Sequence, residues 1–262
     1  MALSASQLYY EEHGDGEPLV LIPGFAAGSW IWYRQIGPLA QSFRVITFDP
    51  RGIGNSPGGS QPLTISNLVD DIADLLRGLK IEEAHILGAS FGGFVAQEFA
   101  LKYPKMTRSL SLCCTSFGGP NHVAPSMETL AAIVSTDGFN TRERIQRNLL
   151  PAFSPEYVRD HPEEVERVID LRVANTLSED VYRSQLATAV SFNAESRAHA
   201  IEAATLVLTG DADAIVPMQN SINLASKIPA AELQTVAGGS HLFFIEQPDE
   251  FNRIVTKFLR RQ

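Results

Sequence analysis

The chain has few cysteines, and their positions do not match the pattern of a disulfide or a zinc site. It has 262 residues and two cysteines, the neighbours Cys113 and Cys114. Successive residues of a strand point to opposite faces, so this apolar run suits two separate thiols better than a disulfide. Two adjacent cysteines also lack the spacing of a zinc site. We therefore expect a reduced, cytoplasmic setting and no metal.

Basic charge and long apolar runs are also scarce. The formal net charge is −9, which argues against nucleic acid or an anionic membrane as a partner. No apolar run reaches the roughly 18 residues that a membrane-spanning helix needs. Residues 1–16 lack the basic start and apolar core of an export signal. With 44% hydrophobic residues, the chain is instead long and apolar enough for a sizeable globular core.

Short apolar runs alternate with helical patterns along much of the chain. Most of the runs are continuous rather than alternating, which is typical of a parallel sheet covered on both faces. Residues 7–12 precede a turn-rich stretch, which predicts an antiparallel hairpin at the start of the sheet. Strands followed by helices predict an open α/β sheet. The expected strands are 18–23, 44–49, 84–89, 109–114, 205–210 and 232–237, and the expected helices are 64–79, 93–104 and 247–262.

One long stretch, residues 116–203, interrupts this alternation. It contains no convincing strand, and the strand pattern resumes only at Thr205. We predict a core domain of residues 1–115 and 204–262, with residues 116–203 as a helical insertion that covers the strand ends. The helical patterns of the insertion are residues 125–135, 140–150, 161–175 and 178–192.

A serine lies between two glycines where an expected strand meets an expected helix. The segment is Gly88-Ala89-Ser90-Phe91-Gly92. A sharp strand-to-helix turn lifts the serine hydroxyl clear of the sheet, and the glycines allow close approach of neighbouring backbone. The N-terminus of the helix offers free N–H groups for a developing oxyanion. Gly-x-Ser-x-Gly alone is a weak signal, so the decisive question is whether a base and an acid accompany it.

A serine nucleophile needs a histidine to take its proton and an acid to orient that histidine. Of the six histidines, His241 follows the last expected strand and precedes the last helix, at the sheet edge where Ser90 is expected. The acid should follow another strand at that edge, where residues 210–217 contain Asp211 and Asp213. Asp213 is favoured because it lies deeper in the loop, whereas Asp211 suits a turn-capping role.

At this point the sequence resembles the α/β-hydrolase family over essentially its whole length. The resemblance implies a mostly parallel eight-stranded sheet flanked by helices, with the insertion as a helical cap (lid). It also implies that Ser90, Asp213 and His241 form the catalytic triad. The matching segments are residues 23–30, 48–56, 88–93, 210–217 and 238–248.

The same resemblance locates further site residues. The oxyanion hole is expected from the backbone N–H groups of Phe25 and Phe91. The turn at residues 48–56 is expected to be structural, with its Asp and Arg bracing loops near the site. The substrate pocket is expected to include four residues: Gly24, Trp30, Trp32 and Leu242. If Trp30 and Trp32 alternate along a strand, one would line the pocket and the other would join the core.

These residues predict acyl transfer to water through an acyl-enzyme, without a metal or cofactor. The substrate class is a small carboxylic ester or lactone, and the chain looks most like 3-oxoadipate enol-lactonases and related small esterases. Such a lactone carries a carboxylate, so its pocket should supply a cation. The insertion has no tryptophan where those lactonases have one, which weakens that specific interpretation. The insertion offers several cations and the sequence does not choose among them: Arg142, Arg144, Arg147, Arg159, Arg172 and Arg183.

Other functions remain open at this stage. The same triad performs C–C bond hydrolysis, although such enzymes usually have Asn where this chain has Ala89, and it also performs perhydrolase chemistry. A sensor or receptor that keeps the triad but turns over slowly is an alternative of another class, and a turnover rate distinguishes it. The oligomeric state cannot be inferred from the sequence.

Overall fold

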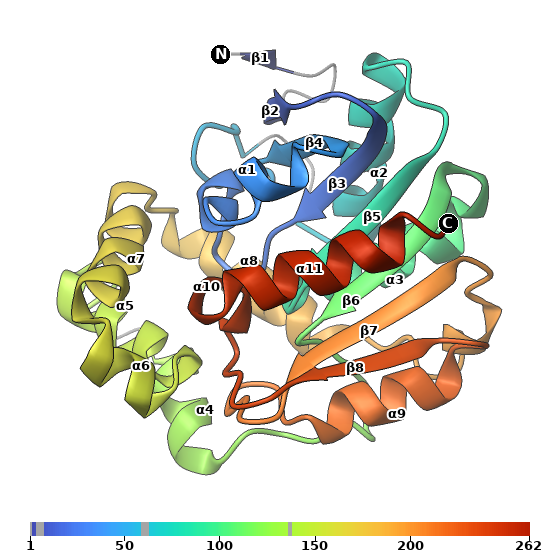
Figure 1. Cartoon of the computed structure of the whole chain (residues 1–262). Coiled ribbons are helices and arrows are strands. Elements are labelled where there is room, and N and C mark those ends of the chain that lie inside the picture. The colour runs from blue at the N-terminus through green and yellow to red at the C-terminus, as the bar shows by residue number, and fades with distance from the viewer. Residues whose placement is uncertain (1, 4–7, 59–62, 136–137) are drawn as a thin grey trace.

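A computed structural model of the chain describes residues 2–3, 8–58, 63–135 and 138–262. Its centre is an eight-stranded sheet with the strand order β1-β2-β4-β3-β5-β6-β7-β8 (Figure 1). Strands β3 to β8 pair with one another in parallel, which confirms the predicted, mostly parallel sheet. The strands are β1 (Ala2–Leu3), β2 (Tyr9–His13), β3 (Glu17–Ile22), β4 (Phe43–Phe48), β5 (Ala84–Ala89), β6 (Thr107–Cys113), β7 (Ala204–Gly210) and β8 (Glu232–Val236).

The predicted hairpin across the turn-rich residues 14–16 is wrong. Strand β2 runs antiparallel to both of its neighbours in the sheet, β1 and β4, and Tyr10 lies opposite Phe48 of β4. Strand β3, which follows β2 in the chain, pairs with β4 and β5 instead. The turn-rich residues 14–16 therefore connect two strands that are not neighbours in the sheet.

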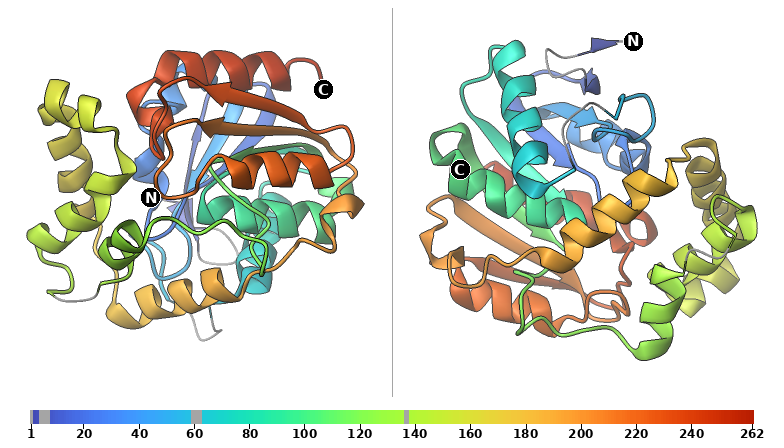
Figure 2. Two further views of the ribbon diagram at one scale, coloured as in Figure 1. Left: turned by 90° about the horizontal axis from the view of Figure 1, so that it is seen from below. Right: turned by 180° about the vertical axis from the view of Figure 1, so that it is seen from behind.

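Helices cover both faces of the sheet (Figure 2). α1 and α11 lie on one face, and α2, α3 and α9 lie on the other. The α2 helix begins one residue after the first position of the predicted range 64–79, because the Thr64 side chain accepts a hydrogen bond from the N–H of Asn67 and caps the helix. The helices outside residues 116–203 are α1 (Ile36–Leu39), α2 (Ile65–Gly78), α3 (Phe91–Lys102), α9 (Gln219–Lys227), α10 (Phe243–Glu246) and α11 (Pro248–Leu259).

The core consists of two layers that share the strands. Leu19 and Leu21 of β3 pack in the layer beneath α1 and α11, whereas Val20 and Ile22 pack in the layer beneath α2 and α3. This division follows from the period of two residues along a strand. Because both faces are buried, the strands read as continuous apolar runs in the sequence.

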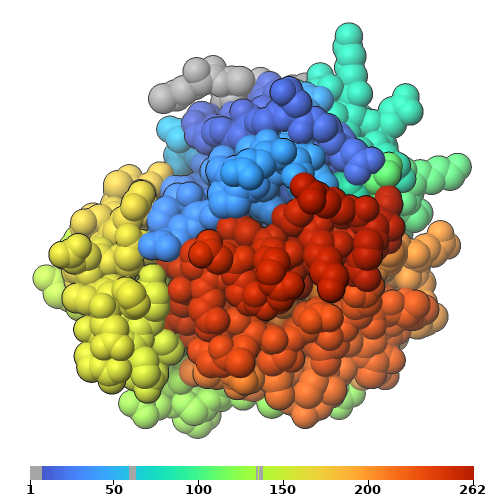
Figure 3. Space-filling view, viewed as in Figure 1, coloured from blue at the N-terminus to red at the C-terminus, as the bar shows by residue number. Residues whose placement is uncertain are grey.

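Residues 116–203 contain five longer helices. Three of them, within residues 142–174, form a lobe at one end of the sheet (yellow and yellow-green in Figures 1 and 3), whereas the last, residues 179–191, crosses the core apart from that lobe (Figure 2). Apolar residues of α5 and α7, such as Ile145 and Val168, join the core layer of α1 and α11. The helices are α4 (Met127–Val134), α5 (Arg142–Leu149), α6 (Pro155–Asp160), α7 (Pro162–Ala174) and α8 (Glu179–Ser191). Four of them match the predicted helical patterns, and α6 was not predicted. None of the helices in the described ranges combines the length and apolarity of a bilayer crossing.

Candidate active site

Ser90 lies in a strained turn between β5 and α3. Its backbone angles are φ +54° and ψ −121°, a conformation that a residue with a side chain adopts only at a cost of about 1–3 kcal/mol. The Ser90 N–H donates a 2.8 Å hydrogen bond to the carbonyl oxygen of Cys113 on the adjacent strand, which anchors the turn. The α3 helix begins at the next residue, Phe91. The sequence therefore produces the predicted strand–serine–helix turn.

The two flanking glycines are required by close contacts of the backbone. A Cβ at Gly88 would lie 2.2 Å from the carbonyl oxygen of Gly92, and a Cβ at Gly92 would lie 2.3 Å from that of Ile22. No other residue fits at either position without a shift of the backbone. The glycines thus allow α3 to start close against β3 and β5, which holds the Ser90 turn at the carboxyl end of the sheet.

The structure joins the predicted histidine and acid. The Nδ1 of His241 donates to Oδ2 of Asp213 over 2.8 Å, and both residues are buried. The other carboxylate oxygen of Asp213 accepts the N–H groups of Ile215 and Val216 at 2.8 Å each, which orients the carboxylate. A carboxylate only accepts hydrogen bonds, so Nδ1 carries the proton and Nε2 is left as the basic nitrogen. In contrast, Asp211 is exposed and accepts the N–H of Gly238, which is the turn-capping role expected for it.

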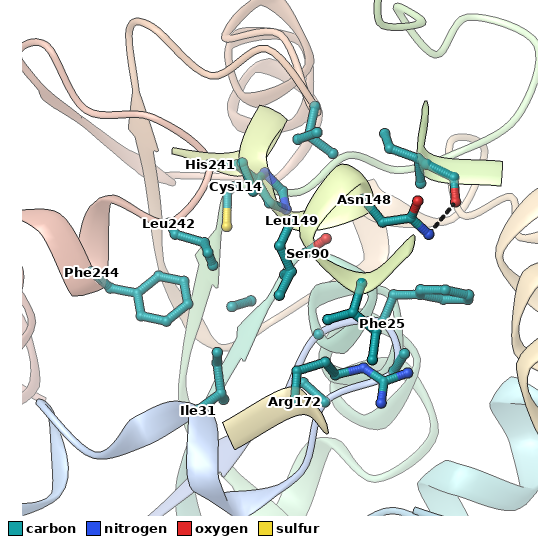
Figure 4. Close-up of a pocket in the computed structure, with 18 of the residues that line it drawn as sticks. Phe25, Ile31, Ser90, Cys114, Asn148, Leu149, Arg172, His241, Leu242 and Phe244 are labelled. Carbon is teal, nitrogen blue, oxygen red and sulfur yellow. Dashed lines mark hydrogen bonds between the residues drawn. The ribbon is translucent and has the colours of Figure 1, made fainter. Parts of the chain in front are cut away.

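Ser90 and His241 line one pocket with a cavity of about 160 Å³ (Figure 4). An engineered cavity of about 150 Å³ elsewhere holds benzene, so this cavity suits a small substrate. Most of the lining side chains are apolar. The lining from the sheet side includes Gly24, Phe25, Trp30, Ile31, Ser90, Cys114, Ile215, His241, Leu242 and Phe244.

Of the four predicted pocket residues, Gly24, Trp30 and Leu242 line the cavity and Trp32 does not. Trp32 is fully buried and packs against Phe244 at 5.2 Å between ring centroids. Trp32 is therefore wrong as a pocket residue, whereas the expectation that one tryptophan lines the pocket and the other joins the core agrees with the structure. The two tryptophans belong to a 3-10 helix, Ser29–Trp32, rather than a strand, so their separation follows from the turn of that helix.

The structure places the two predicted oxyanion donors next to Ser90. Phe91 is the first residue of α3, where backbone N–H groups have no acceptor within the helix. Phe25 follows Gly24, whose backbone lies so close to the serine that a Cβ there would be 3.4 Å from the Ser90 Cβ. The Phe25 and Phe91 rings also contact each other edge to face, with centroids 6.4 Å apart.

The polar turn after β4 braces the loops behind the pocket. Buried Asp49 accepts hydrogen bonds from the N–H and hydroxyl of Ser29 and from the N–H of Asn55. Arg51 makes two 2.7 Å bonds to Asp71 of α2. Neither Asp49 nor Arg51 lines the pocket, so the structure agrees with the structural role expected for this turn.

Residues of α4, α5, α7, α8 and the short 3-10 helix Leu150–Ala152 complete the pocket from the other side. Of the six arginines that the sequence left as candidates, only Arg144 and Arg172 line the cavity. Tyr182 and Asn148 were not predicted, and no local signal marks them, because the register of each helix against the sheet is a tertiary property. The lining from this side consists of Ile133, Arg144, Ile145, Asn148, Leu149, Ala152, Arg172 and Tyr182.

Burial also shifts the pKa values of a pocket cysteine and of two histidines. It raises the pKa of the Cys114 thiol well above its usual value, so this pocket residue is a neutral thiol. Burial lowers the pKa values of His85 and His122, which do not line the pocket. In the described part of the chain, no three His, Cys, Asp or Glu side chains gather in a way that could hold a metal ion.

Comparison with known proteins defines the family. Residues 17–248 match the model of the alpha/beta hydrolase fold, so the chain belongs to the α/β-hydrolase family. It is 30% identical over 253 residues to the protein named "Putative carbamate hydrolase RutD" of Azorhizobium caulinodans, with 97% of this chain and 95% of that protein covered. The predicted fold class is confirmed, and the chain is an enzyme of the hydrolase type.

Two solved structures show the same architecture. A thermophilic esterase from Thermogutta terrifontis, solved with malate bound, is 28% identical with a TM-score of 0.84, and 97% of this chain and 93% of that chain are covered. The enol-lactonase from Burkholderia xenovorans LB400 is 24% identical, also with a TM-score of 0.84, and covers 97% and 96%. At that identity the second likeness supports the fold alone.

Proposed function

We propose that this hydrolase cleaves a small carboxylic ester or lactone, with Ser90 as nucleophile, His241 as general base and Asp213 as the acid that orients it. The observation that carries the proposal is one pocket that contains both a serine in a strained strand-to-helix turn and a histidine bonded to a buried carboxylate. A surface turn or a structural histidine would not need these features together.

In the proposed mechanism, Ser90 Oγ attacks the ester carbonyl carbon while Nε2 of His241 takes the hydroxyl proton. The carbonyl oxygen becomes an oxyanion that accepts hydrogen bonds from the N–H groups of Phe25 and Phe91. The imidazolium, stabilised by the Asp213 carboxylate, gives its proton to the leaving alcohol. Water then attacks the acyl-enzyme by the same route, which releases the acid and restores the serine hydroxyl.

The substrate enters the proposal as a class. The small, mostly apolar cavity supports a short acyl group, and the 28% identical esterase supports ester hydrolysis. A 3-oxoadipate enol-lactone remains one member of this class. Carbamate hydrolysis is a second candidate, favoured by the name of the 30% identical relative, since it uses the same attack on an acyl carbon. C–C hydrolysis, perhydrolase chemistry and slow-turnover ligand sensing are the remaining alternatives.

We also propose that residues 116–203 act as a cap on the core domain of residues 1–115 and 204–262. The described helices of this segment supply one wall of the pocket. A buried hydrogen bond from the Ala26 N–H to the Gln185 side chain of α8, 2.7 Å long, ties this wall to the loop beside Ser90. The cap would then limit the length of the acyl chain and exclude bulk water.

The test is a substrate panel with the wild-type protein and Ser90→Ala. Short p-nitrophenyl esters, an enol-lactone and a small carbamate are compared at one pH. We expect turnover of at least one ester or lactone in the range of about 1–1,000 per second, and its loss in Ser90→Ala. If the carbamate is preferred, the second candidate replaces the first. If the wild type is inert on the whole panel, the hydrolytic proposal fails and ligand binding becomes the leading alternative.

A further inference from the structure

Two arginines of the insertion are buried in the wall of the pocket. Arg144 of α5 is 2% exposed and Arg172 of α7 is 6% exposed, and both line the cavity that contains Ser90. In the view of Figure 4, Arg172 lies across the pocket from His241, with Ser90 and Phe25 between them. Arginines are almost never buried unless they are paired, so this pair calls for an explanation.

Neither arginine has a carboxylate partner among the described residues. The ion pairs of α5, α7 and α8 involve their exposed arginines, such as Arg142 with Glu166 and Arg183 with Glu179. Among the residues that the structure describes, no Asp or Glu lines the pocket. Burial, and after it the nearby charge of Arg144, lower the pKa of Arg172 to about 10. Arg172 therefore remains charged at neutral pH.

The contacts they do make leave hydrogen-bonding capacity open. Arg144 donates from Nε to the carbonyl oxygen of Ser135, and Arg172 donates from Nη1 to that of Asn175. The Nη2 of Arg144 is buried and has no hydrogen-bond acceptor in the described structure. Buried charges without paired acceptors are strongly unfavourable, so a fold would not retain two of them for stability alone.

The Arg144 guanidinium packs against two aromatic rings of the insertion, and its carbon lies 4.8 Å from the centroid of the first, Phe139. The Arg144 guanidinium packs on the Tyr182 ring, with 4.6 Å between its carbon and the ring centroid. The Tyr182 ring in turn meets the Phe25 ring edge to face at 4.8 Å between centroids. One aromatic layer therefore separates the Arg144 guanidinium from the Phe25 loop beside Ser90.

From this geometry we propose that Arg144 and Arg172 bind a second, ionised carboxylate of the substrate, so that the enzyme acts on half-esters of short dicarboxylic acids or on lactones that carry a carboxylate. A planar carboxylate matches the paired N–H groups of a guanidinium and would supply the missing negative charge. This proposal rests on the proposed ester or lactone hydrolysis, and names the substrate class of the same site.

The test compares two substrates of nearly equal shape. Monoethyl succinate carries a carboxylate where ethyl 4-methylpentanoate carries an isopropyl group. Both are assayed with the wild type, Arg144→Met, Arg172→Met and, as a matched control from the exposed surface of α8, Arg183→Met. We expect the wild type to prefer monoethyl succinate. Each pocket variant should lose about 10- to 100-fold in kcat/KM on it, mainly through KM, because hydrogen bonds to charged groups are lost.

The neutral ester and the melting temperature separate this role from a structural one. We expect the ratio of kcat/KM for monoethyl succinate to that for ethyl 4-methylpentanoate to fall about 10- to 100-fold in each pocket variant and to stay at the wild-type value in Arg183→Met. The melting temperatures of the pocket variants should be unchanged or higher, since a buried charge is removed. The proposal is overturned if the wild type prefers the neutral ester. It is equally overturned if Arg144→Met and Arg172→Met weaken hydrolysis of both substrates to the same extent.

A binding measurement distinguishes failure of this proposal from failure of the hydrolytic function. If the wild type hydrolyses neither ester, calorimetry with monoethyl succinate is performed on the wild type and on Arg172→Met. Binding by the wild type that is lost in the variant would uphold the carboxylate site while the hydrolytic function fails. Absence of binding by the wild type would overturn the carboxylate site as well.

Discussion

The exchange of Asp213 for asparagine tests the proposed triad with little disturbance of the fold. The carboxylate is buried and makes three hydrogen bonds, to the N–H groups of Ile215 and Val216 and to Nδ1 of His241. The amide oxygen of an asparagine can still accept from the two backbone N–H groups. The amide nitrogen then faces Nδ1, and because it is a donor it favours the tautomer with the proton on Nε2. That tautomer cannot take the proton of Ser90.

The magnitude follows from this change of tautomer and from the loss of the charge that stabilises the imidazolium. The same exchange in a serine protease triad lowers kcat by about 10⁴-fold, which corresponds to about 5 kcal/mol of transition-state stabilisation. We expect a loss of about 10³- to 10⁴-fold here, with a stability loss below about 2 kcal/mol because two of the three hydrogen bonds remain.

The assay is hydrolysis of p-nitrophenyl acetate, corrected for the spontaneous rate, together with thermal unfolding of each variant. Asp211→Asn is the matched control, because Asp211 lies in the same loop and is exposed. Within the described structure, the one hydrogen bond of its side chain is accepted from the N–H of Gly238. It should keep its activity within about 2-fold. If Asp213→Asn keeps more than a tenth of the wild-type kcat/KM, Asp213 does not perform the role proposed for it.

Three further predictions concern the scaffold. Gly92→Ala would place a Cβ 2.3 Å from a carbonyl oxygen of β3 and should lower the free energy of unfolding in denaturant by about 3 kcal/mol or more. The control Gly78→Ala, at an exposed and open position of α2, should raise it by about 0.5–1 kcal/mol. Equal effects of the two exchanges would contradict the requirement for glycine at position 92. Asp49→Ala leaves two buried donors of Ser29 and the N–H of the exposed Asn55 without their acceptor and should lower the unfolding free energy by about 3–5 kcal/mol. A neutral result would show that the turn does not depend on these bonds. Burial lowers the pKa of His85 in the folded state, so the unfolded chain binds the proton first and stability falls as the pH drops below about 6.5. The melting temperature of His85→Gln should therefore fall less than that of the wild type between pH 8 and 5. An identical fall in both proteins would exclude His85 as a source of the pH dependence of stability.

Much of the core could be predicted because its signals are local. Six apolar runs corresponded to strands β3 to β8 with ends within two residues, since continuous apolar runs report burial on both faces of a sheet. The Ser90 turn was predicted because its glycines are demanded by backbone contacts within a few residues and across one strand. The partner of β2 was not predicted, because strand pairing depends on the order of strands and not on the turn that follows a strand.

The insertion shows the limit of such signals. Four helices of the insertion were predicted. The α6 helix was not, because its six residues are too few for a periodic pattern. The α9 helix of the core was not predicted either, and it contains the weak helix formers Ser and Asn. Six arginines of the insertion were left as equal candidates for binding a substrate carboxylate. The sequence of a helix does not show whether a given arginine faces solvent or a cavity. Trp30 and Trp32 likewise read alike, although one lines the pocket and the other is core.

The sequence by itself determined the family, the strands β3 to β8 of the core, and the residue types available for nucleophile, base and acid, because these depend on short patterns in a fixed order along one chain. Only the tertiary structure decided that His241 meets Asp213 over 2.8 Å, that both Ser90 and His241 face one small cavity, and that two arginines without acidic partners close its far wall. The physical reason is that these contacts join segments 28 or more residues apart. The geometry of these contacts is set by how strands, loops and the insertion pack together. Which side chains are buried, and which charges lie near one another, is decided by the same packing.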